Sequence, residues 1–190
     1  MVARRWLLGL TMALMLPATT TASADAGSAH ASASKFTIRI AKGSVTRIGA
    51  FRTRRDATIG AAIRVFGPPS SQKLEGEGCQ VDWRRLRLRI YFANFGGHAP
   101  DQTTCSPSVG LAQSFTVRGR RFRTWKGLRP GDRSSAVRRR HPNAAFRRGT
   151  WWLRTAVSRI GTESEYAVVE ALVSGGRVGV LRGWIGAAGD

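Results

Sequence analysis

The chain is short of acidic residues, of histidine and of recognisable catalytic motifs, and each shortage narrows the functions open to it. Only 11 of its 190 residues are acidic against 31 lysines and arginines, which gives a formal net charge of +20. A surface with this charge attracts anions and resists self-association. The chain has three histidines and no G-x-S-x-G, H-E-x-x-H or phosphate-binding loop, so we predict a non-catalytic protein without a cofactor. An enzyme of an unrecognised type is the least favoured alternative.

Long apolar runs are also scarce. The run over residues 6–16 is shorter than the roughly 20 residues that a helix needs to cross a bilayer. Basic residues precede this run, and a small-residue A-x-A cleavage site follows at 22–24. We therefore predict a signal peptide over 1–24 and a flexible leader over 25–34. The mature chain is expected outside the cytoplasm, secreted or at the exterior of the cell envelope, with no transmembrane segment.

Cysteine is equally scarce, and Cys79 and Cys105 are the only two. No cysteine precedes them, so the sequence offers no site for bacterial lipid attachment. An even number of cysteines in an exported protein favours a disulfide, which closes a loop of roughly 25 residues and adds about 3 kcal/mol of stability. His98 is the only histidine close to them in sequence, and we expect no metal site.

The sequence contains two pairs of similar segments, an internal repeat that we call the echo. The segment FTIR at 36–39 returns as FTVR at 115–118, and TIGAAIRVFGP at 58–68 returns as the more basic DRSSAVRRRHP. Each copy has the pattern of a strand, a helix and then further strands. We therefore predict an α+β fold of two tandem repeats, each a helix packed on one face of a small antiparallel sheet. The predicted repeats are 35–111, which contains the disulfide, and 112–190.

Start and stop signals mark the first helix, expected over 58–66. Thr58 can cap its N-terminus, and Gly67, followed by two prolines, can end it. In the second copy Asp132 takes the position of the cap. The apolar stripe of the first helix consists of Ile59, Ala62, Ile63 and Phe66.

The segment RRLRLRIYF at 84–92 alternates between polar and apolar residues from Arg85 onward, which predicts a half-buried antiparallel strand. Its apolar side chains are expected to face the first helix, and these are Leu86, Leu88, Ile90 and Phe92. The other side of the strand is then open, and we predict that it is a binding face. The members of this face are Arg85, Arg87, Arg89 and Tyr91.

Two further groups extend the candidate binding residues into the second repeat. Arg138, Arg139 and Arg140 crowd the last turns of the second helix, where cations also have a purely structural role against the helix dipole. Trp151 and Trp152 are adjacent, so in a strand they point to opposite faces and at most one belongs to the core. An exposed tryptophan beside arginine is typical of binding hot spots, whereas partial burial under loops is the plainer interpretation.

The order of these elements resembles two families. A capped helix ending in FGPPS, followed by Cys, Trp and strands, is similar to the unit of the outer-membrane assembly lipoproteins. It also resembles the secreted β-lactamase-inhibitor-protein fold, which is a tandem repeat of such a unit. The stretch GLRPGDRSSAVRRRHPNA at 127–144 is similar to a run common in these units. The resemblance implies this fold and binding through an open sheet face, and it implies no particular target.

Together these patterns predict an exported binding protein that holds an unknown protein or an anionic cell-envelope component on an open, Arg-rich sheet face. The alternative is an electrostatic binder of anionic polymer or membrane surface, since guanidinium groups suit phosphate and carboxylate. A solvated surface whose arginines reflect a GC-rich coding sequence is the plain interpretation beside both. Export, together with the lack of any recognised motif, argues against nucleic acid as a partner.

Overall fold

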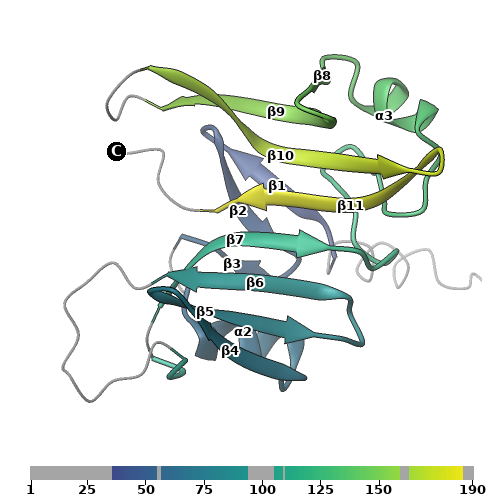
Figure 1. The fold of residues 1–190 in the computed structure, drawn as a ribbon. Coiled ribbons are helices and arrows are strands. Elements are labelled where there is room, and N and C mark those ends of the chain that lie inside the picture. Colours follow the sequence, from purple (N-terminus) through teal and green to yellow (C-terminus); the bar gives the residue numbers. More distant parts are fainter. Residues whose placement is uncertain (1–35, 55–56, 94–104, 109, 159–162, 186–190) are drawn as a thin grey trace, which may run out of the picture.

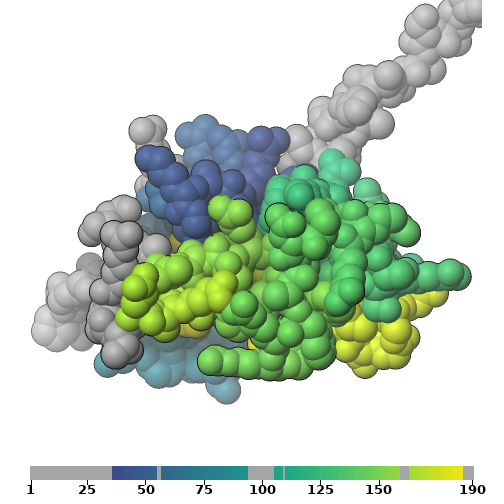
Figure 2. Space-filling model, turned by 90° about the horizontal axis from the view of Figure 1, so that it is seen from above, coloured from purple at the N-terminus to yellow at the C-terminus, as the bar shows by residue number. Residues whose placement is uncertain are grey.

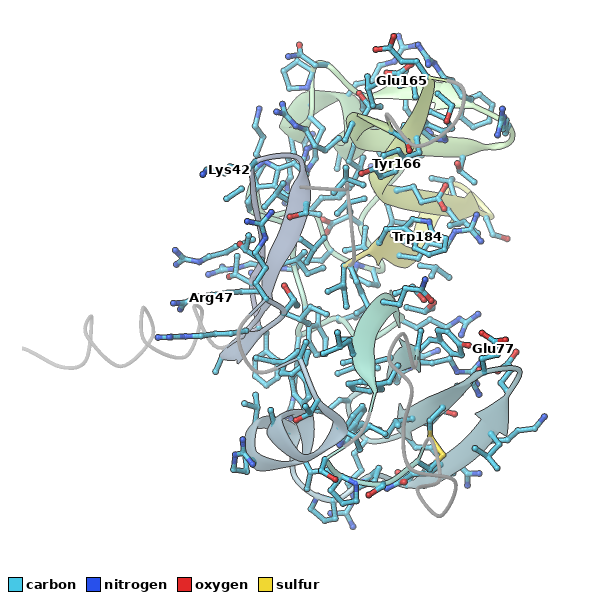
Figure 3. The ribbon with its side chains drawn as sticks, turned by 90° about the vertical axis from the view of Figure 1, so that its left-hand side faces the viewer. Lys42, Arg47, Glu77, Glu165, Tyr166 and Trp184 are labelled. Carbon is cyan, nitrogen blue, oxygen red and sulfur yellow. A yellow bond between two sulfur atoms is a disulfide. The ribbon has the colours of Figure 1, made fainter. Side chains whose placement is uncertain are left out.

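The protein is built mainly of β-strands (Figure 1). A computed structural model describes residues 36–54, 57–93, 105–108, 110–158 and 163–185. Eleven strands form two antiparallel sheets, and these residues also contain two short helices. In the side view of Figure 3 the small sheet and the first of these helices lie on one side of the large sheet, and the other side of the large sheet is open.

The large sheet has eight strands in the order β4-β5-β6-β7-β11-β10-β9-β8. Two meanders, β4 to β7 and β8 to β11, meet where β7 pairs with β11. The strands of the first meander are β4 (Ser71–Glu75), β5 (Gly78–Trp83), β6 (Leu88–Ala93) and β7 (Leu111–Val117). Those of the second are β8 (Ala145–Arg147), β9 (Thr150–Ser158), β10 (Ser164–Ser174) and β11 (Arg177–Trp184).

The junction between the meanders requires a glycine. A Cβ atom added at Gly183 of β11 would lie 2.4 Å from the carbonyl oxygen of Val168 and 2.9 Å from the ring of Phe115. Real Cβ atoms do not approach backbone so closely, so a larger residue would push β11 away from its neighbours. The absence of a side chain at this position therefore helps to keep the two meanders in one sheet.

The small sheet consists of β1 (Ile38–Ala41), β2 (Ser44–Ile48) and β3 (Phe51–Arg52). Lys42 and Gly43 make the turn between β1 and β2, with φ of 47° and 72°. Positive φ at both central residues is the requirement of the favoured two-residue hairpin turn. The inward side chains of the sheet are fully buried, and they are Ile38, Val45, Ile48 and Phe51.

The first helix, α2 (Ile59–Phe66), forms where the sequence predicts it. The Thr58 hydroxyl accepts a hydrogen bond from the backbone N–H of Ala61, and Gly67 ends the helix with φ of 82°. Because a left-handed residue after the last turn is easiest for glycine, the stop signal in the sequence has a direct physical cause.

The core lies between the two layers, and α2 joins them. The ring of Phe66 packs against Phe51 of the small sheet and against Trp83 of β5, at centroid distances of 5.9 and 5.4 Å. The Trp83 indole N–H also donates a 2.8 Å hydrogen bond to the carbonyl of Gly67, just after the helix. The predicted partners Leu88, Ile90 and Phe92 are buried in the same core cluster, whereas Leu86 lies in the turn before β6. The contact between the rings of Phe66 and Trp83 joins α2 to the large sheet.

The second helix, α3 (Ser135–Arg140), is shorter than predicted and starts later. Ser134 precedes it and makes no capping bond with its side chain. The prediction that Asp132 is the cap is wrong. Its carboxylate instead accepts hydrogen bonds of 2.9 Å from the backbone N–H of Arg129 and from the guanidinium of Arg140. Asp132 thus ties the loop before α3 to the end of the helix.

The predicted α+β fold of two tandem repeats is also wrong. The described residues are 52% strand and 11% helix. The strands predicted to form a separate sheet in each repeat instead form one continuous eight-stranded sheet. The echoed segments take different positions, because FTIR runs into β1 of the small sheet, whereas FTVR lies largely in β7 at the centre of the large sheet. The predicted boundary between residues 111 and 112 falls inside β7. This strand pairs with β6 along one edge and with β11 along the other, and so joins the two predicted repeats into one sheet.

The predicted disulfide between Cys79 and Cys105 is confirmed, with Cα atoms 5.2 Å apart. Such a bond fits an oxidising compartment outside the cytoplasm. The predicted signal peptide at 1–24 and leader at 25–34 lie outside the described residues. Neither helix in the described part of the chain has the length and apolar character needed to cross a membrane.

Candidate anion-binding site

The predicted open face is assembled only in part. Strand β6 begins at Leu88, and Arg85 and Arg87 lie in the exposed turn before it. Arg87 has φ of 52° there, a conformation that non-glycine residues seldom adopt. Arg89 and Tyr91 do lie on the open side of β6. The uninterrupted alternation of the sequence hides this turn, because no residue in it is a typical turn former.

The arginines described on this open face form ion pairs with acidic side chains. Arg89 stands opposite Asp82 of β5 in the sheet register, and its Nε donates a 2.7 Å hydrogen bond to the carboxylate. Arg182 of β11 stands opposite Glu170 of β10 and pairs with it in the same way. The Tyr91 hydroxyl donates to the carbonyl of Glu75. The open side of the large sheet is therefore polar and nearly balanced in charge, and it is not rich in unpaired arginine.

Two of the three arginines at the end of α3 are engaged in contacts within the protein. The guanidinium of Arg138 lies over the ring of Trp151, 5.2 Å from its centroid. Arg140 bonds to Asp132 and to the carbonyl of Gly127. Arg139 is exposed. The cluster thus stabilises the end of α3, which is the structural role that the helix dipole suggests.

Neither predicted tryptophan is an exposed hot spot. Trp151 is half-buried, and Trp152 is buried beneath the guanidinium groups of Arg147 and Arg148. Among the residues that the structure describes, the exposed tryptophan is Trp184 of β11, with 49% of its surface accessible. Trp184 stands two residues after Arg182, and the period of two along a strand could have placed both on one exposed face.

A row of arginines crosses the small sheet, and sequence reasoning missed it. Arg39 of β1 stands opposite Arg47 of β2, which in turn stands opposite Arg52 of β3. All three side chains are exposed on the outer face of the sheet, and Figure 3 shows Arg47 pointing away from the body of the molecule. Adjacent strands are about 4.8 Å apart, so the three side chains leave the backbone within about 10 Å. We call Arg39, Arg47 and Arg52 the arginine row.

No acidic side chain offsets this row within the described residues 36–54, which contain two more cations, Lys42 and Arg54. Like charges directly opposite one another in a sheet are destabilising. The fold therefore gains nothing from the row, whereas the large sheet places Arg89 and Arg182 opposite acids. In Figure 3 Lys42 and Arg47 lie on the side of the molecule away from Glu77 and Trp184. The arrangement suits an external anion that bridges neighbouring guanidinium groups.

No group of three potential metal ligands occurs in the part of the chain that the structure describes. The chain matches no known family, no curated protein and no solved structure. The resemblance to the lipoprotein unit and to the inhibitor fold therefore stays a prediction.

Proposed function

We propose that the protein is a non-catalytic binder of an anionic polymer of the cell envelope, which it holds on the arginine row. The single observation that carries the proposal is the register that sets Arg39, Arg47 and Arg52 opposite one another without an acid between them. Each guanidinium can donate two parallel hydrogen bonds to a carboxylate or phosphate. A polymer with regularly repeated anionic groups engages all three at once and removes their mutual repulsion.

A polymer is favoured over a membrane surface by the side chains around the row. The exposed large apolar residues of the described chain are Leu74, Leu111, Phe146, Val157 and Trp184, and none of them lies in the small sheet. Proteins that lie on membranes combine basic charge with apolar side chains that enter the headgroup region. The outer face of the small sheet offers charge alone. The disulfide and the predicted signal peptide support a location outside the cytoplasm, where envelope polymers occur.

The test compares two triple variants of equal charge. R39Q/R47Q/R52Q removes the arginine row, and R84Q/R85Q/R87Q removes three exposed arginines from the turn before β6. Binding to polygalacturonate and to polyphosphate is measured by titration calorimetry over a range of salt concentrations. We expect the row variant to lose at least about tenfold in affinity and about 2 units in the slope of log K against log salt, since each contact contributes about 0.7. The turn variant should lose much less.

Equal losses in the two variants would mean that net charge alone drives binding, and the row would then have no special role. Vesicles that contain phosphatidylglycerol form a third arm of the experiment. If they bind the wild type more tightly than either polymer does, and the row variant loses that binding, the partner is a membrane surface. If no polyanion binds at low salt, the proposed function is wrong.

Protein docking on the open side of the large sheet is a second candidate, favoured by the exposed indole of Trp184. Interfaces that are matched in shape respond less to salt than polyanion binding does. The candidate predicts that W184A lowers the association of the protein with washed cell envelopes and that R39Q/R47Q/R52Q leaves it unchanged. The reverse result would exclude it.

A further inference from the structure

A hollow that shares no residue with the arginine row lies where the β1–β2 turn of the small sheet meets the second meander of the large sheet. Its volume is about 490 Å³, which is within the range of small-molecule sites. The turn sits close against β9, because a Cβ added at Gly43 would lie 3.3 Å from the Cβ of Ala156. Figure 2 looks onto this side of the molecule, where the purple small sheet meets the green segments of the second half.

Rings and apolar side chains form one part of the lining. Trp125 is half-buried and stands edge-on to the buried ring of His141, with centroids 4.8 Å apart. Trp152 and Leu153 of β9 are buried beside them. His141 is held through its Nε2, which is 2.8 Å from the hydroxyl of Thr124. This part of the lining therefore offers fixed, uncharged ring surface to a ligand.

Cations form the rim. Lys42, Lys126 and Arg154 are exposed at the hollow, and none of them takes part in the four ion pairs found among the described residues. The one acid in the lining, Glu165, already accepts hydrogen bonds from Thr155 and, to a smaller effect, from Arg147, and both lower the pKa of its carboxyl. The hollow thus combines a ring surface with a net positive rim.

Uncharged polar groups complete the lining. The exposed amide of Asn143 can donate and accept hydrogen bonds, and the hydroxyl of Thr155, which already donates to Glu165, can still accept one. A purely aromatic acid would use the rings and the cations but would make no hydrogen bond to these two groups. A sugar ring uses all three, because its C–H face packs on an indole, its hydroxyls bond to amide and hydroxyl groups, and its acid meets the rim.

We propose that this hollow binds an acidic monosaccharide, a single sugar ring that carries a carboxylate or a phosphate. The ring packs against Trp125, and the acid pairs with Lys126 and Arg154. The site shares no residue with the arginine row, so it does not depend on polymer binding there.

The experiment titrates the mature protein with glucuronate, glucose 6-phosphate, glucose and benzoate, and follows the indole N–H signals by NMR. The Trp125 signal is assigned with W125F. We expect saturable shifts at Trp125 with at least one of the two sugar acids, and weaker binding of glucose and benzoate. The two sugar acids separate a carboxylate ligand from a phosphate ligand.

Two charge-matched variants decide whether the rim is responsible. K126Q/R154Q should weaken sugar-acid binding about tenfold or more, since it removes two charge-assisted contacts. R129Q/R133Q, in exposed arginines that do not line the hollow, should leave the affinity unchanged. Four results would overturn the proposal: no saturable shift at Trp125 with either sugar acid, equal binding of glucose, equal or tighter binding of benzoate, or equal effects of the two variants. Polymer binding by the arginine row is measured separately, so either proposal can fail alone.

Discussion

The cross-strand partners of arginine differ between the two sheets of this protein. On the large sheet Arg89 faces Asp82 across the strands and Arg182 faces Glu170, so each cation is matched by an acid. On the small sheet Arg47 faces another arginine on each side. Arginine thus stabilises the large sheet and destabilises the small sheet. Local destabilisation of this kind is expected where function requires an unpaired charge.

The largest effect should come from the covalent bond in the large sheet. Replacing both cysteines, as C79S/C105S, removes a crosslink with a sequence separation of 26 and should lower the free energy of unfolding by about 3.5 kcal/mol. Urea unfolding measures this loss. The affinity of the folded variant for polygalacturonate should stay unchanged, because the arginine row lies on the other sheet. A loss of affinity in the folded variant would show that the two sheets do not act separately.

A slightly smaller effect should come from acid, and it should act on His141, which follows α3 and lies outside both sheets. Burial lowers the pKa of His141 from its ordinary 6.5 to about 4, and Lys126 and Arg140 add to this. The unfolded chain therefore takes up a proton at a higher pH than the folded protein does. The resulting stability is fully present above about pH 6.5 and is lost as the pH falls towards 4, by up to about 3 kcal/mol.

Urea unfolding at several pH values between 7 and 4.5 measures this dependence on pH. H141Q has no imidazole to protonate and should show a shallower decline, which isolates the histidine from the carboxylates that titrate in the same range. Arginine keeps its charge throughout, so the contrast between the two sheets should survive. Equal slopes in the variant and the wild type would contradict the assignment.

The smallest effect is the one that compares the sheets directly. R47Q relieves two like-charge contacts on the small sheet and should raise the free energy of unfolding by about 0.5 kcal/mol. R89Q removes a solvent-exposed ion pair from the large sheet and should lower it by a similar amount, about 0.5 kcal/mol. Both differences should shrink in high salt. Changes of the same sign in the two variants would mean that the arginine row is not strained by repulsion.

Local features of this fold could be predicted from the sequence, and pairings over long distances could not. The cap and stop around α2 depend on a few neighbouring residues, and the disulfide follows from a chain that has only two cysteines; all of them are present. The arginine row depends on a register between three short strands, which no local pattern encodes. The fusion of the two meanders depends on β7 and β11, which are far apart in the chain.

Three predictions were wrong because their patterns have more than one structural outcome. The alternation in the segment 84–92 continues through a turn. Arg87 adopts a left-handed conformation in this turn, and the sequence has no glycine there that would indicate it. The echo of TIGAAIRVFGP marks two helices, but it carries no information on how the strands around them pair. An aspartate before a helix can cap it or can hold the preceding loop, and Asp132 holds the loop.

The position of β11 has a consequence for how the chain acquires its structure. It is the last strand of the described chain, yet it lies in the middle of the large sheet between β7 and β10. Its pairing with β7 joins segments that are distant in sequence, and contacts of this kind slow folding. Until β11 has been synthesised, β7 presents an open edge of hydrogen-bonding groups, which is a site for mispairing. A chain cut short before Arg177 should therefore aggregate rather than fold as a smaller version of the protein.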